Sequence, residues 1–406
     1  MESIHLMETD KNKNIAMERS VSIAIAAAAL MQMSHGGVTP ALEAIGQSFP
    51  NATDTTLALL NTMPVLTSIP STFVAGRLAG KKFSFRTLML TGLGFLLIGG
   101  LVAFFCQSIE AVLLCRAVFG IGLGIIAPMV SAFTLCIFPD EQANKQLALN
   151  TVAANFGSIL FQLTGGYLCL LGWRYTFLCY LIVLLPIGIV YTIIKPSYGK
   201  VEDNKAQQSE QSKKMNLKKV ALWCGIYISF FIAFYVFVNN MSWVIVGNGY
   251  GASADVAWVL SVFNIGGLCG GALYRKHLFK LGPYVFLTAL LLCGMGFGCV
   301  ILAKELWVLY GASILFGGGF GIFVPAAMYY GGTSVEAAQR STMVSYMSIA
   351  NNLGGFSSAY LLSAACALLG LEGRIMHFYL GIGVFSIVAG ILLVWGLKEK
   401  DKRTDT

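Results

Sequence analysis

The chain is a succession of long apolar runs separated by short polar gaps, and this pattern limits its fold more than any other feature. A helix needs about 20 apolar residues to cross the hydrocarbon core of a bilayer. Twelve runs of that length can be drawn, so the predicted fold class is an all-α membrane protein with twelve transmembrane helices. The runs lie near 20–44, 55–79, 86–106, 110–137, 146–170, 174–194, 219–246, 255–275, 282–303, 306–331, 341–369 and 374–397.

The composition favours lipid over water as the main solvent. Of the 406 residues, 56% are hydrophobic and 11% are charged, whereas charged residues make up about 25% of a typical soluble domain. The formal charge of +8 does not indicate a nucleic-acid partner, because the basic residues are scattered through the polar gaps. The ten cysteines have no C-x-x-C spacing, so we expect reduced thiols and neither a metal nor a cofactor.

The sequence predicts three parts: an N-terminal six-helix half at 1–195, a linker at 196–218 and a C-terminal six-helix half at 219–406. The linker is polar and rich in lysine, which predicts a flexible segment in the cytoplasm. Both termini are then cytoplasmic, and 23 of the 27 Lys and Arg residues lie on the cytoplasmic side of a cell membrane. The first run is longer than a signal peptide, so we predict a retained helix.

The fourth and fifth runs recur as the tenth and eleventh at a constant offset of 197 residues. Parallel repeats of six helices are a transporter architecture in which the substrate binds between the halves near the midplane of the membrane. The sequence therefore predicts two pseudo-symmetric halves. The matching pairs include Gly120 with Gly317, Gly122 with Gly319, Gly124 with Gly321, Pro128 with Pro325, and Gly157 with Gly354.

The gap after the second run carries a recognisable motif, Gly76-Arg77-Leu78-Ala79-Gly80-Lys81-Lys82-Phe83-Ser84-Phe85-Arg86. This stretch resembles the cytoplasmic loop signature of the major facilitator superfamily, and the resemblance extends over essentially the whole chain. It implies a gating loop in which Gly76 allows close helix packing and Lys81 and Arg86 belong to a basic relay. The chain has Gly80 where the family usually has Asp, and Phe83 where it usually has Gly.

The fourth run contains a basic residue at depth, in the stretch from Leu114 to Gly120. This stretch is similar to the family's buried-arginine motif, which implies proton transfer in proton-coupled exporters. An arginine near the centre of a membrane helix costs roughly 2.5–3.5 kcal/mol, so Arg116 should face a cavity or a partner. A structural arginine bonded to backbone carbonyls is the alternative.

Polar residues recur at helical spacing in the first run, at Gln32, His35, Thr39 and Glu43, and this stripe should face the interior. Histidine changes charge near neutral pH, which suits proton exchange at His35; a neutral histidine bonded to a neighbouring helix is the alternative. The resemblance places four further candidates on helices that line the cavity. The predicted substrate and proton pathway is Gln32, His35, Thr39, Arg116, Asn155, Asn239, Asn240 and Tyr330.

These features favour a secondary transporter that exports a small neutral or anionic amphipathic molecule by alternating access, as a proton-coupled antiporter. No Asp or Glu lies near the middle of a run, where a lipophilic cation would need a carboxylate. The fifth run has the Gly165-Gly166 pair typical of exporters without the preceding Gly-Pro, which leaves open an importer of a small organic acid or nutrient. A monomer would suffice for either.

Two functions of other classes stay as remote alternatives: a sensor that does not transport, and a membrane enzyme. The sequence contains neither H-E-x-x-H nor Gly-x-Ser-x-Gly, and we predict no enzymatic activity.

Overall fold

The structure is a computed structural model that describes residues 18–79, 83–195, 216–276, 281–282, 284–336, 339–370 and 373–404. In these ranges the chain is helical, apart from loops and one isolated bridge between Ala79 and Phe83. Residues 18–29 are helical and lead into the first labelled element. The elements of the N-terminal part of the chain are η1 (Leu30–Ala41), α2 (Leu42–Ser48), α3 (Asp54–Leu78), α4 (Phe85–Leu101), η2 (Val102–Phe105), α5 (Ile109–Ile137), α6 (Asp140–Cys169), η3 (Trp173–Val183) and α7 (Leu184–Ile193).

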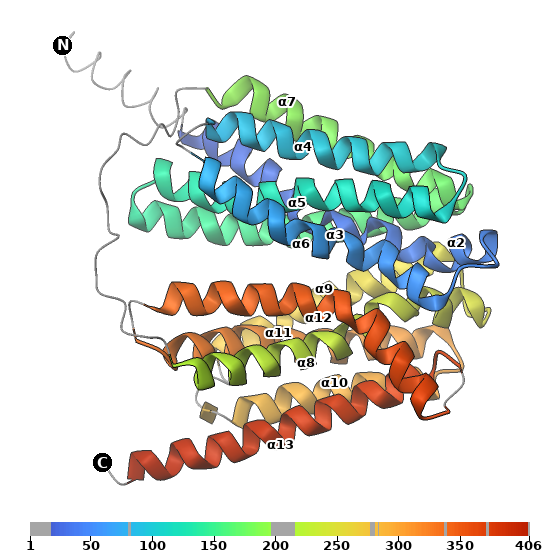
Figure 1. Ribbon diagram of the computed structural model, residues 1–406, viewed down its shortest axis with the longest axis vertical. Helices are drawn as coiled ribbons and strands as arrows, with labels where there is room; N and C mark the ends of the chain where they lie inside the picture. The colour runs from blue at the N-terminus through green and yellow to red at the C-terminus, as the bar shows by residue number, and fades with distance from the viewer. Residues whose placement is uncertain are drawn as a thin grey trace. The chain divides into compact units, whose positions relative to one another are not determined.

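The C-terminal part of the chain repeats this pattern of long helices, which Figure 1 shows running lengthwise beside one another within each part. Its elements are α8 (Leu217–Ser242), η4 (Trp243–Gly247), α9 (Ser253–Lys276), α10 (Val285–Leu302), α11 (Leu306–Thr333), α12 (Arg340–Leu368) and α13 (Met376–Thr404). The predicted linker at 196–218 lies almost entirely outside the described residues.

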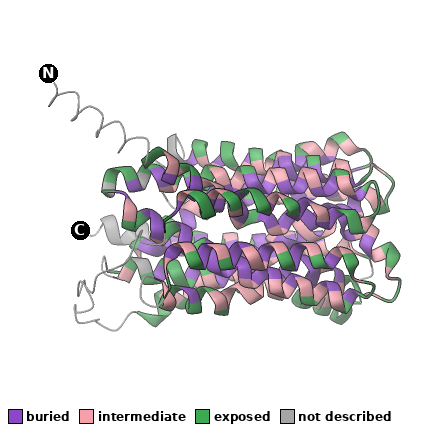
Figure 2. Cartoon of the chain, turned by 90° about the horizontal axis from the view of Figure 1, so that it is seen from above, coloured by how far each residue is buried: buried purple, intermediate pink, exposed green. Residues whose placement is uncertain are grey.

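Eleven helices of the described chain are long and apolar enough to cross a membrane. The twelfth long helix, α12, has 29 residues but carries many serines and asparagines, which lower its hydropathy. Large hydrophobic side chains such as Leu114, Leu291 and Ile387 are exposed on the helices. Figure 2 shows buried and exposed residues alternating along the helices, as expected when one side packs on protein and the other faces lipid. The all-α fold with twelve helices is confirmed.

The starts of several helices follow from local sequence. Ser84 accepts a hydrogen bond from the Thr87 N–H at the start of α4, and Ser108 does the same for Ala111 at the start of α5. Asn216 accepts from the first N–H groups of α8. A side-chain oxygen at this position satisfies a backbone donor that lacks a partner within the helix.

The described residues form two compact units. Unit 1 is drawn from Met1–Gly37, Met63–Thr164 and Arg174–Ala206, and unit 2 from Val38–Thr62, Gly165–Trp173 and Gln207–Thr406. Helix α3 therefore begins in unit 2 and continues in unit 1. The division at 1–195, 196–218 and 219–406 describes the sequence repeat and stays a prediction.

The glycine stripe that recurs in the sequence makes equivalent contacts in the two units. A Cβ atom added at Gly120 would meet the Pro64 carbonyl of α3, and one at Gly317 would meet the Phe263 carbonyl of α9. On a different side of the same two helices, Gly122 contacts α4 and Gly319 contacts α10. The helix pair α5 and α3 in unit 1 thus packs as α11 and α9 do in unit 2, because only glycine lets the backbones approach so closely.

Candidate functional site

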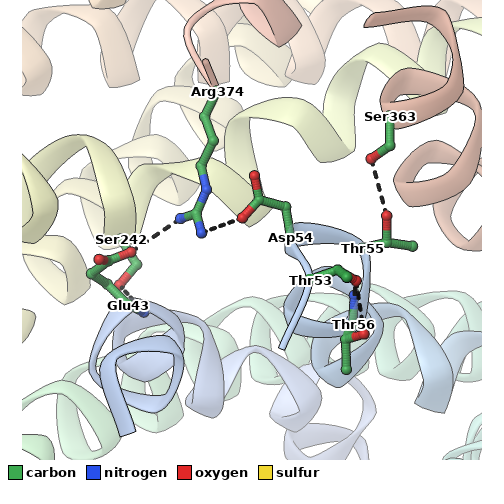
Figure 3. Close-up of polar contacts among 8 residues, drawn as sticks. All are labelled: Glu43, Thr53, Asp54, Thr55, Thr56, Ser242, Ser363 and Arg374. Carbon is green, nitrogen blue, oxygen red and sulfur yellow. Dashed lines mark hydrogen bonds and ion pairs between the residues drawn. The ribbon is translucent and has the colours of Figure 1, made fainter. Parts of the chain in front are cut away.

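Three charged side chains meet at one end of unit 2. Arg374 lies just before α13, Glu43 lies in the first turn of α2, and Asp54 is the first residue of α3. The guanidinium donates a hydrogen bond to Glu43 Oε2 at 3.0 Å and another to Asp54 Oδ1 at 2.5 Å (Figure 3). We call Glu43, Asp54 and Arg374 the latch cluster.

The two ion pairs of the latch cluster differ in their shielding from water. The side chains of Arg374 and Glu43 are 20% and 13% exposed, whereas that of Asp54 is 50% exposed. Water screens an exposed ion pair strongly and a shielded one less. The pair between Arg374 and Glu43 is therefore the stronger of the two.

Neighbouring groups hold the latch cluster in place. The Glu43 backbone N–H donates to the Ser242 hydroxyl oxygen at 3.1 Å (Figure 3). That hydroxyl donates to the Pro40 carbonyl at 3.0 Å. This serine, the last residue of α8, thereby ties α8 to the start of α2. The Arg374 guanidinium also lies 5.8 Å from the centre of the Trp243 ring, within range of a cation–π interaction.

The first turn of α3 adds further polar contacts beside Asp54. The Thr56 N–H donates to Thr53 Oγ1 at 3.2 Å, which caps the helix, and the Asp54 carboxylate sits where the helix dipole favours a negative charge. The Thr55 hydroxyl donates to Ser363 Oγ of α12 at 3.1 Å (Figure 3). The start of α3 is thus joined both to the segment before α13 and to α12.

A small cavity lies against the latch cluster. Its volume is about 30 Å³, enough for one or two water molecules. This end of unit 2 is therefore nearly closed. The lining residues beyond the latch cluster include Ala58, Tyr235, Asn239, Asn240, Ala359 and His377.

A chain of hydrogen bonds joins two of the predicted pathway residues. The buried Thr39 hydroxyl donates to Asn61 Oδ1 at 3.2 Å, and Asn61 Nδ2 donates to Asn239 Oδ1 at 3.0 Å. Asn61 was not among the predicted pathway residues, although it is a buried polar side chain within a membrane helix. Asn240 donates to the Val236 carbonyl of its own helix at 2.9 Å and lines the cavity.

Arg116 lies in unit 1 and is completely buried. Its guanidinium donates to the Tyr180 hydroxyl at 2.8 Å and to the His35 carbonyl at 2.8 Å. It also lies 4.8 Å from the centre of the Phe119 ring. This is the arrangement described by the structural alternative, and contact with a substrate or proton stays a prediction.

The first helix supplies the carbonyl groups that this arrangement uses. Between Leu30 and Ala41 the chain is a 3-10 helix with a break at Met33, in a stretch that contains Gly36, Gly37 and Pro40. A broken helix inside a membrane leaves carbonyls that need other donors. The Ser34 carbonyl accepts from the Tyr180 hydroxyl at 3.3 Å, and the His35 carbonyl accepts from Arg116.

The predicted polar stripe of the first helix is therefore changed in geometry. A 3-10 helix has three residues per turn, so the four-residue step from His35 to Thr39 does not stay on one face. Gln32 and His35 belong to unit 1, whereas Thr39 and Glu43 belong to unit 2. Both Gln32 and His35 are half-buried, and the buried His35 Nδ1 has no hydrogen-bond partner in the described part of the chain.

The remaining predicted pathway residues, Asn155 and Tyr330, make contacts of their own. Asn155 is half-buried and donates to the Thr151 carbonyl of its own helix at 2.9 Å. Tyr330 packs against the rings of Phe286 and Trp395, each with its centre 5.6 Å away.

The gating loop is only partly described. Lys81 lies outside the described residues. Arg86 donates to the Tyr191 carbonyl at 2.8 Å and lies over the Tyr191 ring. No described atom lies within 4 Å of the place where a Cβ of Gly76 would be, and the close packing at Gly76 stays a prediction.

Comparison with solved structures identifies proteins of the same fold. The nucleoside transporter NupG superposes with a TM-score of 0.77 at 11% identity, covering 92% of this chain and 99% of NupG. The POT family transporter PepTSo gives 0.74 at 12% identity, covering 94% and 98%. A D-xylose–proton symporter gives 0.68 at 15% identity, covering 91% and 96%.

Comparison of sequences gives two curated relatives over shorter stretches. The major facilitator superfamily multidrug transporter mfsC of Aspergillus fumigatus is 32% identical over 32% of this chain and 25% of its own length. The uncharacterized MFS-type transporter Rv1250 of Mycobacterium tuberculosis is 30% identical over 30% of this chain and 20% of its own length. The matched part thus spans a quarter or less of each relative.

A family match covers most of the chain and agrees with the helices, the repeat and the neighbouring folds. Residues 24–359 match the Major Facilitator Superfamily. The chain therefore belongs to the major facilitator superfamily, and it is a multi-pass membrane protein.

Proposed function

We propose that the chain exports a small neutral or anionic amphipathic molecule across the cell membrane in exchange for protons, by alternating access. In this proposal both termini lie in the cytoplasm. The latch cluster is the observation that carries the proposal. It joins Glu43 and Asp54, which precede the linker, to Arg374, which follows it, at the end predicted to be extracellular. In this proposal the cluster closes the extracellular side and opens when cargo is released.

The proposed cargo follows from the charges within the helices. Arg116 is a buried cation at depth, and the carboxylates of the latch cluster lie at helix ends. A buried positive charge disfavours a second cation nearby and favours an anion or a neutral polar group. The relation to a multidrug transporter supports export.

The proposed proton carrier is His35. Its buried Nδ1 is without a partner among the described residues, and the Arg116 guanidinium holds the backbone carbonyl of the same residue. Histidine gains and loses a proton near neutral pH more readily than other side chains do. Movement of the Arg116 guanidinium would therefore shift the backbone of His35.

The test is the accumulation of three fluorescent amphiphiles of matched size, one anionic, one neutral and one cationic, in cells with and without the protein. We expect the protein to lower accumulation of the anionic and neutral probes, and a protonophore to remove this effect. Arg374→Ala should abolish most of the lowered accumulation. Arg374→Lys should retain part of it, since lysine keeps the positive charge but lacks the bidentate donor geometry of arginine.

An importer of a small organic acid or nutrient is the second candidate, which the missing Gly-Pro before Gly165 leaves open. Accumulation that rises with the protein and falls with the protonophore would establish it and overturn export. Export of the cationic probe that is unchanged by Arg116→Gln would overturn the proposed cargo class.

A further inference from the structure

Two cysteine side chains meet where α4 and α5 are joined in unit 1. Cys106 follows η2, and Cys115 lies in the second turn of α5. Their Sγ atoms are 3.7 Å apart, and both thiols are free. The side chains therefore point toward each other, although neither transport nor the buried Arg116 requires a thiol at either position.

The backbone allows these two sulfurs to approach further. A disulfide bond is about 2.0 Å long, so the sulfurs have to close a gap of roughly 1.7 Å. Cys106 has extended backbone angles, with φ −69° and ψ 140°, and lies beyond the last turn of η2. Its N–H donates to the Ala103 carbonyl at 3.3 Å, so a shift changes only this last hydrogen bond of η2, while Cys115 stays anchored in α5.

The pair is also within reach of a small reagent. Cys106 is half-exposed, and its neighbours Phe105, Gln107 and Ser108 are exposed. Cys115 is half-exposed as well. The predicted topology places this connection on the outer side, where disulfides persist in many compartments.

We propose that Cys106 and Cys115 form a redox modification site that closes to a disulfide by exchange with a small organic disulfide. The Cys106 thiolate attacks one sulfur of the reagent, which forms a mixed disulfide and releases one thiolate. The Cys115 thiolate then attacks Cys106 Sγ and releases the second. Two protein thiols are oxidised, one reagent disulfide is reduced to two thiols, and the two protons pass to the released thiolates.

The bond would fasten a structurally important part of unit 1. Cys115 directly precedes Arg116. Its carbonyl oxygen lies 2.7 Å from the place where a Cβ of Gly99 would be, so α4 and α5 pack closely there. Arg174 Nε donates to the Cys106 carbonyl at 3.4 Å. The disulfide would join the end of α4 to the turn of α5 that carries Arg116, and it would stabilise the fold by restricting the unfolded chain.

The experiment uses the full-length protein purified in detergent and treated with oxidised glutathione. Peptides are mapped by mass spectrometry, with digestion that includes cleavage after Glu110 to separate the two cysteines. We expect Cys106 and Cys115 in one linked species, reversed by dithiothreitol. The midpoint temperature of thermal unfolding, measured by tryptophan fluorescence, should rise by about 3 °C or more on oxidation.

Two serine variants complete the design. Cys106→Ser should leave Cys115 free after oxidation and remove the thermal shift. Cys269→Ser, which removes an exposed thiol on α9, should keep both effects. Free thiols at both positions after oxidation, or glutathione that stays attached to Cys106, would overturn the proposal. None of these readouts depends on the direction of transport.

Discussion

Arg116 shows how one residue shapes its surroundings in a membrane protein. The cost of a buried guanidinium predicts that it needs partners, and the sequence identifies the residue for that reason. Its partners are the Tyr180 hydroxyl and the His35 carbonyl. Tyr180 could not be predicted, because its role depends on a break in the first helix that exposes carbonyl groups to it.

The Tyr180 hydroxyl can be removed without changing the size of the ring. Tyr180→Phe leaves an Arg116 N–H and the Ser34 carbonyl without this partner, and hydrogen bonds to a buried charged group contribute about 1.5–3 kcal/mol. We expect Tyr180→Phe to lower the free energy of unfolding by about 1.5–3 kcal/mol, measured by thermal unfolding of the purified protein. The exposed Tyr175→Phe is the control and should change little. Equal stability of the two variants would show that Arg116 does not rely on this hydroxyl.

At the scale of helices, the sequence was informative about which elements exist and less so about their form. The apolar runs predict all twelve helices, because this signal depends on residues near one another in the chain. The repeated glycines predict that the fourth and fifth helices recur as the tenth and eleventh. The 3-10 form of Leu30–Ala41 was missed, since glycine and proline are compatible with several kinds of break. Close packing at Gly76 was expected from a family pattern, and it stays a prediction because the loop at 80–82 lies outside the described residues.

Two glycines of α11 form a matched pair for testing the glycine stripe. A Cβ at Gly321 would collide with the backbone of Gly267, whereas a Cβ at Gly311 would have no described atom within 4 Å. Gly321→Ala should therefore destabilise the protein by about 1–3 kcal/mol through overpacking. Gly311→Ala should be neutral or slightly stabilising because alanine favours helix. Thermal unfolding measures both, and a harmless Gly321→Ala would contradict the close approach of α9 and α11.

For the whole molecule, the latch cluster is the feature that sequence patterns could not assemble. Glu43, Asp54 and Arg374 each appear at the end of an apolar run, and only the tertiary fold brings residues 43 and 374 to within hydrogen-bond distance. The sequence nevertheless predicted two residues near the cluster. Thr39 and Asn239 are joined through Asn61, and Asn239 lines the cavity beside the latch cluster. If the cluster is a gate, breaking it should open the cavity beneath it.

Labelling of a cysteine in that cavity tests this central claim directly. Ala359→Cys places a thiol on the cavity wall, and a membrane-impermeant maleimide added from outside should react with it slowly while the latch cluster is closed. Two partly exposed ion pairs contribute about 0.4–2 kcal/mol together, so Arg374→Ala should raise the labelling rate about 2- to 30-fold. Lys304→Ala, which removes another cation at a predicted outer loop, should leave the rate unchanged. An Arg374→Ala rate equal to that of this control would contradict the account.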